Sequence, residues 1–341
     1  MEKSKKLNLG ISILRVWMAF EVILLHRMSW RGYEGLLFDF LKACELFSVP
    51  VFMIIAFYLS EKTLEESGPS KIKQRFIRLF IPQAGWAMIC WTVYVLTDVI
   101  FMHKLSHGLN DLLIAIISGC REGTNPSTWF QCVLILLTFF YYVIFRYLDH
   151  KKAWIAVYVS LFMALLIQFN GAYYDFFQNQ SYEVVNTIGR IFEVMPFASI
   201  GLILKHLEVE KKLKDKRMIM ILAFIFLFVL GFYLPFPRTE RGFFEGLYPL
   251  YMGTVLFLVF VLLPLERIQD KSRQFIIQAT RFTLGIYCAH RLLYSILEIV
   301  YELLGMAPKS FTKCLITYLV CYLMSFIMSI FPGNIFRKMV D

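Results

Sequence analysis

The apolar stretch at residues 7–26 carries three ionisable side chains, Arg15, Glu21 and His26, that a purely lipid-facing segment would lack. A charge near the centre of a bilayer costs at least about 2.5 to 3.5 kcal/mol, so such groups usually belong to a site or a pathway. On an α-helix, Arg15 and His26 would lie only about 20° apart around the axis and about 16 Å apart along it. The two residues therefore form one stripe, whereas Glu21 lies off it and is interpreted as a packing or ion-pair residue.

Arg75 and Arg78 form a second pair, one helical turn apart, at the start of another apolar run. Each guanidinium offers a planar fork of donors, so two of them on one helix face suit the phosphate groups of a ligand. The same pair also fits a simple anchor at the cytoplasmic boundary of a membrane, where Lys and Arg gather. The spacing alone leaves both interpretations open.

Arg190 and Glu193 combine opposite charges three residues apart at the start of a later apolar run. This spacing suits a local ion pair, and the same residues could line the outer mouth of a site. Trp129 opens another run beside Phe130, which is typical of the aromatic belt at a membrane interface.

Three further histidines carry weaker signals. His290 lies inside an apolar run, where a lone histidine is more often hydrogen-bonded packing than a catalyst. His103 and His107 are four residues apart, a spacing that could hold a metal, but no third ligand accompanies them in the sequence. We therefore predict no metal site from the sequence.

These residues lie on segments that the composition predicts to be membrane helices. The chain has 341 residues, of which 58% are hydrophobic and 17% aromatic, a composition typical of an integral membrane protein. Because crossing a bilayer takes about 20 apolar residues, the sequence predicts an all-α bundle with ten transmembrane helices, and no connection is long enough for a soluble domain. We expect a single transmembrane domain over 1–341, with spans at 9–27, 43–60, 79–101, 129–148, 153–170, 190–206, 217–234, 247–265, 282–304 and 312–331.

The distribution of Lys and Arg predicts the orientation. Most of them fall in the termini and in the loops that lie on the same side of the membrane as the N-terminus. Because Lys and Arg gather on the cytoplasmic side, both termini are predicted to lie in the cytoplasm. The net charge of +10 then reflects topology and contact with anionic lipid headgroups rather than binding to nucleic acid.

Taken together, the two charged pairs resemble the signature of membrane acyltransferase family 3. Arg15 and His26 have ten residues between them, and Arg75-Phe76-Ile77-Arg78 is followed by Ile81-Pro82 and Trp86, as in that family. Weaker matches are Pro50-Val51-Phe52, Trp129-Phe130, Pro196-Phe197 with Gly201, and Leu284-Gly285-Ile286-Tyr287 before His290. The chain departs from the family at Ala56-Phe57, where Ser-Gly is common, and at Ser127, where a His is common.

The resemblance implies roles for particular residues. His26 would act as general base or as the residue that briefly accepts the acyl group, since imidazole suits both tasks. Arg15 would position the donor or keep the surroundings of His26 polar. Arg75 and Arg78 would bind the phosphates of acyl-CoA, with acetyl-CoA as the default donor, and no metal is implied. The further candidates for lining the cavity are His290, Arg190, Glu193 and Trp129.

The resemblance also implies partners and a location. The acceptor would be a hydroxyl of an extracytoplasmic or lipid-linked surface polysaccharide, such as a capsule, and a separate extracytoplasmic transferase could complete the transfer. The protein would lie among the lipids of a bacterial cell membrane. The alternative is a secondary transporter or flippase with a path of intramembrane charges, namely Arg15, Glu21, Asp98, Glu193 and Glu298.

Overall fold

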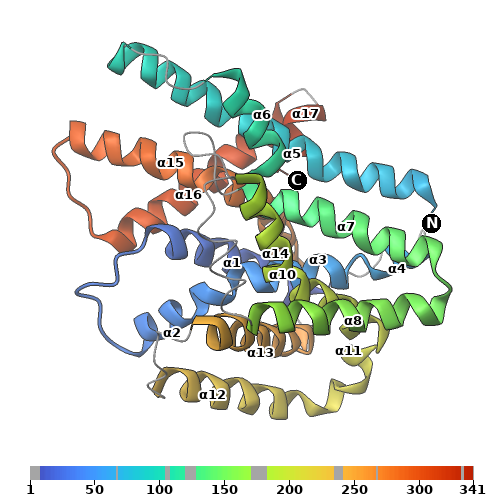
Figure 1. Cartoon of the computed structure of the whole chain (residues 1–341). Coiled ribbons are helices and arrows are strands. Elements are labelled where there is room, and N and C mark those ends of the chain that lie inside the picture. The colour runs from blue at the N-terminus through green and yellow to red at the C-terminus, as the bar shows by residue number, and fades with distance from the viewer. Residues whose placement is uncertain are drawn as a thin grey trace.

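The computed structural model describes residues 8–66, 68–103, 108–119, 128–169, 183–233, 241–265, 268–331 and 334–340, and within them it contains helices and no strand. Figure 1 shows long helices lying side by side, with α5 at one edge of the bundle and α12 at the other. The all-α prediction is confirmed for this part of the chain.

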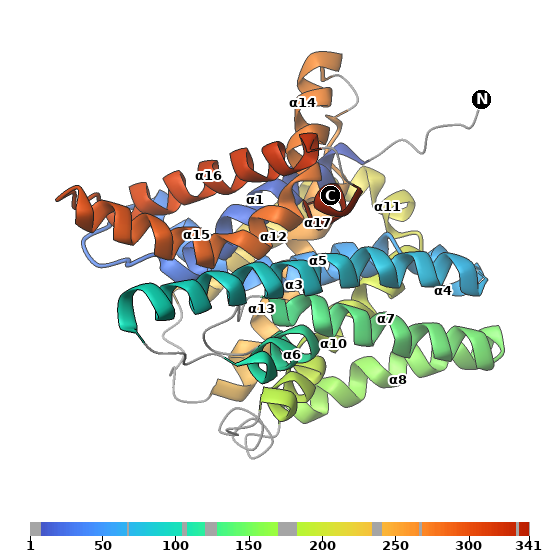
Figure 2. The same ribbon diagram turned by 90° about the horizontal axis from the view of Figure 1, so that it is seen from above.

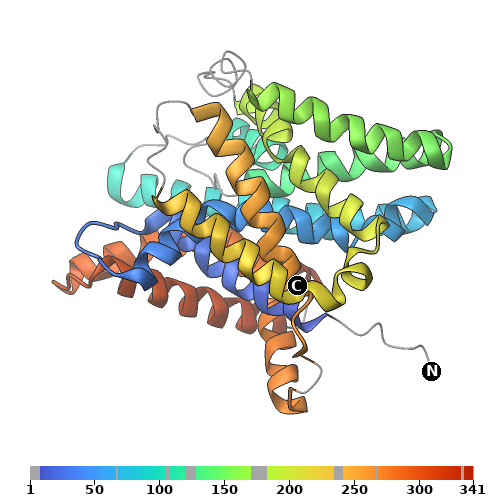
Figure 3. The same ribbon diagram turned by 90° about the horizontal axis from the view of Figure 1, so that it is seen from below.

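The longest helices form the body of the bundle. They are α1 (Leu9–Arg27), α5 (Pro69–Thr97), α7 (Trp129–Tyr147), α8 (His150–Phe169), α10 (Glu183–His206), α12 (Arg217–Tyr233), α13 (Arg241–Val261), α15 (Thr283–Leu303) and α16 (Ser310–Ile330). The shorter helices are α2 (Leu36–Cys44), α3 (Ser48–Tyr58), α4 (Glu61–Glu66), α6 (Leu109–Ser118), α11 (Val209–Lys212), α14 (Asp270–Arg281) and α17 (Asn334–Val340). Figures 2 and 3 show that α14 stands out from the bundle.

Six helices of the described residues are long and apolar enough to cross a membrane, namely α1, α5, α7, α8, α10 and α16. The bent pair α2 and α3 would make a seventh span. Helices α12, α13 and α15 overlap the predicted spans 217–234, 247–265 and 282–304 but do not belong to this set. Helix α12 has only 17 residues, and α15 carries Arg291, Glu298 and Glu302. The chain is therefore a multi-pass membrane protein, while the count of ten and the cytoplasmic termini stay predictions.

Helix α1 lies among α3, α13, α14, α15 and α16, and its apolar side chains Leu14, Met18 and Val22 are completely buried. Its first turn is fixed by Asn8, whose side-chain oxygen accepts a hydrogen bond from the backbone of Ile11, as an N-cap does. The amide nitrogen of Asn8 also donates to the carbonyl of Val261 in α13. The helix that carries Arg15 and His26 is thus held in place from its first residue.

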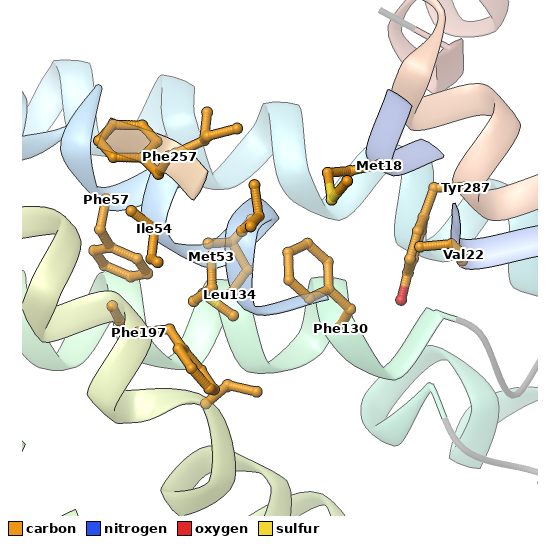
Figure 4. Packing of buried hydrophobic residues seen from close by; sticks show 14 of the residues in the cluster. Met18, Val22, Met53, Ile54, Phe57, Phe130, Leu134, Phe197, Phe257 and Tyr287 are labelled. Carbon is orange, nitrogen blue, oxygen red and sulfur yellow. The ribbon is translucent and has the colours of Figure 1, made fainter. Parts of the chain in front are cut away.

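The core surrounds α3, as Figure 4 shows for Met53, Ile54 and Phe57 beside Leu134 of α7 and Phe197 of α10. Helices α3 and α10 approach so closely that a Cβ atom on Gly201 would lie 2.5 Å from the carbonyl oxygen of Ile54. Such an approach excludes every larger side chain, so this glycine sets the spacing of the two helices.

Candidate active site

Both residues of the predicted stripe reach the same neighbour, α15. The guanidinium of Arg15 donates a 3.1 Å hydrogen bond to the hydroxyl of Thr283. The ring of His26 stacks on the ring of His290, with centroids 5.4 Å apart and planes 17° apart. Thr283 and His290 lie two helical turns apart along α15. Helices α1 and α15 therefore hold the arginine at one level and a pair of imidazoles at another.

The two imidazoles differ in access and in hydrogen bonding. His26 is exposed, whereas His290 is completely buried. His290 Nδ1 lies 2.7 Å from the carbonyl oxygen of Tyr287, and since a carbonyl only accepts, this nitrogen carries the hydrogen. The other nitrogen, Nε2, has no hydrogen-bond partner among the described residues. His26 is thus the imidazole that a substrate can reach, and the buried ring of His290 packs against it.

Cationic side chains surround the imidazole pair. The charges of Arg27, Arg190 and Arg291 all act on His26. Arg27 lies 4.7 Å from the ring centroid of Tyr294 and donates a 3.3 Å hydrogen bond to a serine hydroxyl of α15. Guanidiniums fixed in this way beside an imidazole can stabilise an anionic group or the oxyanion that develops during acyl transfer.

The predicted lining residues on α7 and α10 join the same surroundings. Arg190 pairs with Glu193 at 3.2 Å, which confirms the local ion pair that their spacing indicates. Its guanidinium also lies 4.5 Å from the ring centroid of the buried Trp129, a favourable cation–π geometry. The structure thus groups Arg190, Glu193 and Trp129, and of the three it is Arg190 whose charge acts on His26.

The other arginine pair lies near Arg15. The charge of Arg78 acts on both Arg15 and Arg75, so three guanidiniums gather at one end of the stripe. Arg78 is exposed, and Arg75 is half-buried with its Nε lacking a hydrogen-bond partner among the described residues. Such a cluster of cations suits the phosphates of a ligand.

Helix α5, which carries this pair, is anchored further along its length. The indole nitrogen of Trp86 donates a 3.1 Å hydrogen bond to the carbonyl of Met339 in α17. Gln83 donates to the carbonyl of Ala115 in α6 at 3.1 Å. These buried contacts fix the helix on which Arg75 and Arg78 stand.

The possible metal-binding pair of histidines falls partly outside the described part of the chain. His107 lies outside the described residues, so the pair with His103 is not tested.

For the transporter alternative, three of the carboxylates have separate local partners: Glu21 accepts from Trp17 at 2.6 Å, Glu193 pairs with Arg190, and Glu298 lies 3.9 Å from a lysine of α16.

Sequence reasoning missed Arg27 and Arg291 as members of the site. Each directly follows a histidine of the pair, His26 or His290. That adjacency is a signal that the sequence contains, but it gains meaning only once the two histidines are known to meet.

Membrane-crossing helices that bring an accessible imidazole and fixed guanidiniums together define a polytopic membrane protein whose site suits acyl transfer. A family model described as an acyltransferase domain, that of acyltransferase family 3, matches residues 8–331. The chain therefore belongs to this family of acyltransferases, as its resemblance predicts. No curated protein and no solved structure matches it.

Proposed function

We propose that this protein is a membrane O-acyltransferase that moves an acyl group, acetyl by default, from cytoplasmic acyl-CoA to a hydroxyl of an extracytoplasmic or lipid-linked surface glycan. The observation that carries this proposal is the exposed His26 stacked on the buried His290 at 5.4 Å. The same helix leads from this imidazole to Arg15 and its arginine neighbours.

The arginines supply the donor end. Arg75 and Arg78 bind the phosphates of CoA, because their two guanidiniums gather with that of Arg15 into one cationic cluster. The thioester stands at the far end of a long flexible arm, which extends from this cluster along the stripe toward His26. The distance to cover is about 16 Å along the helix.

His26 supplies the chemistry at the other end. As general base it takes the proton of the acceptor hydroxyl, and the oxygen attacks the thioester carbonyl. The resulting oxyanion is stabilised by the nearby guanidiniums, the carbon–sulfur bond breaks, and the proton passes to the CoA thiolate. In the alternative route the imidazole itself attacks the thioester and passes the acyl group to the hydroxyl. Both routes require His26.

The acceptor, a glycan that is extracytoplasmic or linked to a membrane lipid, approaches from the end of α1 that carries His26. A bacterial cell membrane with the N-terminus in the cytoplasm gives the donor access to Arg75 and Arg78. A separate extracytoplasmic transferase is a further partner where the final acceptor lies beyond reach of the bundle.

The experiment is binding of radiolabelled acetyl-CoA to the purified chain in lipid nanodiscs. We expect saturable binding that Arg75→Ala/Arg78→Ala weakens at least tenfold. The matched control is Lys71→Ala/Lys73→Ala, which removes two exposed cations from the same helix and leaves the affinity within twofold. A folded wild-type chain that binds no acetyl-CoA would overturn the proposal and favour a transporter. Equal losses of affinity in the two double variants would show that the arginines contribute only general positive charge and no specific phosphate site.

A further inference from the structure

A second cluster of polar side chains lies where α4, α8 and α10 come together. Glu61 and Glu65 stand one turn apart on α4, and His206 is the last residue of α10. One ligand atom from each of these three residues lies within 4.8 Å of the other two. The acyl-transfer chemistry described above uses none of them.

Glu61 is the buried member of the cluster. It is 5% exposed, and its Oε2 is buried without a hydrogen-bond partner among the described residues. A buried carboxylate oxygen without a partner is costly, and a second carboxylate beside it increases the cost. The charges of Lys62 and Lys205 act on Glu61, but no donor among the described residues reaches its Oε2. A cation bound between the two carboxylates would offset this cost.

Neighbouring aromatic side chains hold the other two members in place. The indole nitrogen of Trp154 lies 3.4 Å from Glu65 Oε1, and its ring stacks on His206 with centroids 3.7 Å apart. His150 Nε2 lies 2.9 Å from the same oxygen of Glu65. Metal ligands in proteins are typically oriented by such surrounding contacts.

We propose that Glu61, Glu65 and His206 form a binding site for a divalent transition-metal ion, with Zn²⁺ as the best fit. Mixed carboxylate and imidazole donors suit Zn²⁺, whereas Mg²⁺ and Ca²⁺ prefer oxygen alone. His150 or a water supplies the fourth ligand. This inference stands independently of the acyl-transfer proposal.

The geometry needs little adjustment. Bonds of about 2.0 to 2.1 Å in a tetrahedral site place ligand atoms about 3.4 Å apart, so separations up to 4.8 Å close by rotation of the side chains. The ion can enter past His150, whose side chain is 69% exposed. Once bound, it would link α4 to the end of α10 and stabilise the folded chain.

The test uses the full chain in nanodiscs, stripped by a chelator and titrated with ZnCl₂. Calorimetry and elemental analysis give affinity and stoichiometry. We expect one Zn²⁺ per chain, bound at least tenfold more weakly by Glu61→Gln and by His206→Gln. The matched control is Glu66→Gln, an exposed carboxylate on the same helix, which leaves the affinity unchanged. Zn²⁺ raises the unfolding temperature of the wild type, whereas equimolar Mg²⁺ does not.

A second measurement does not depend on any variant folding. Co²⁺ bound by the wild-type chain in this site is expected to show the strong visible absorption of four-coordinate cobalt. Absence of Zn²⁺ binding by the wild type, or binding by folded Glu61→Gln as tight as that of the wild type, would overturn the proposal. The weak spectrum of six-coordinate cobalt would contradict the proposed ligand set. Loss of acetyl-CoA binding would leave this inference untouched.

Discussion

Replacing His290 separates a positioning role from a direct role in proton transfer. The ring of His290 is buried beneath His26, and one of its nitrogens donates to the carbonyl of Tyr287. Its other nitrogen carries a lone pair and has no partner among the described residues. We expect the rate of acyl transfer to depend on the ring of His290 rather than on this lone pair, because the stack holds the exposed imidazole of His26 in place.

The size of the effect follows from the stack. A stacked aromatic pair contributes about 0.5 to 1.5 kcal/mol beyond the area that it buries. If this entire contribution is lost from the transition state in His290→Ala, the rate falls about 2- to 13-fold. Removing a general base costs about 10²- to 10⁴-fold. The two ranges do not overlap, so the measured rate assigns the role.

The assay is turnover of saturating labelled acetyl-CoA by the wild type, His290→Ala, His290→Phe and His26→Ala in nanodiscs. His290→Phe keeps an aromatic ring beneath His26 and removes both nitrogens, so we expect a rate within about 3-fold of the wild type. If folded His290→Phe, with its affinity for acetyl-CoA intact, loses as much activity as His26→Ala, the lone pair of His290 takes part in the chemistry and a purely positioning role is excluded.

Two further predictions concern the framework. Gly201→Ala places a methyl group 2.5 Å from a backbone carbonyl of α3 and should destabilise the protein by about 1 to 3 kcal/mol in reversible unfolding. Gly253→Ala, whose nearest contact is 3.5 Å, should be neutral or stabilising and serves as its control. For Glu210, burial favours a higher pKa, but hydrogen bonds from Tyr58 and Lys205 outweigh it and hold the pKa below its ordinary 4.5. Glu210→Gln should therefore lower the unfolding temperature at pH 7, and its difference from the wild type should shrink as the pH falls below 4.5. A difference that grows in acid would contradict the assigned direction.

The sequence predicts local periodicity well and distant contacts poorly. The stripe of Arg15 and His26 follows from helical geometry alone, and both side chains reach α15 as one stripe should. The hydrogen bond from Arg15 to Thr283, however, joins residues 268 positions apart, and no local pattern specifies it. The same holds for His290, which the sequence presents as a lone histidine in an apolar run.

The charged cluster at α4 was missed for the same reason. Glu61 and Glu65 appear in the sequence as part of a polar segment between two apolar runs. They gain a chemical meaning only when the fold brings His206 from the end of another helix. Membrane spans are also hard to assign from composition, because a helix such as α15 contains three charged residues within an otherwise apolar run.

The role of His26 is tested most directly by a single-turnover comparison of the wild type with His26→Ala, using labelled acetyl-CoA bound to the same nanodisc preparation. Because the proposed phosphate contacts lie at Arg75 and Arg78, the variant should bind acetyl-CoA within about 3-fold of the wild type. Its release or transfer of the acetyl group should fall at least about 100-fold. A folded His26→Ala chain that turns over acetyl-CoA at the wild-type rate would contradict the proposed role of His26 in acyl transfer.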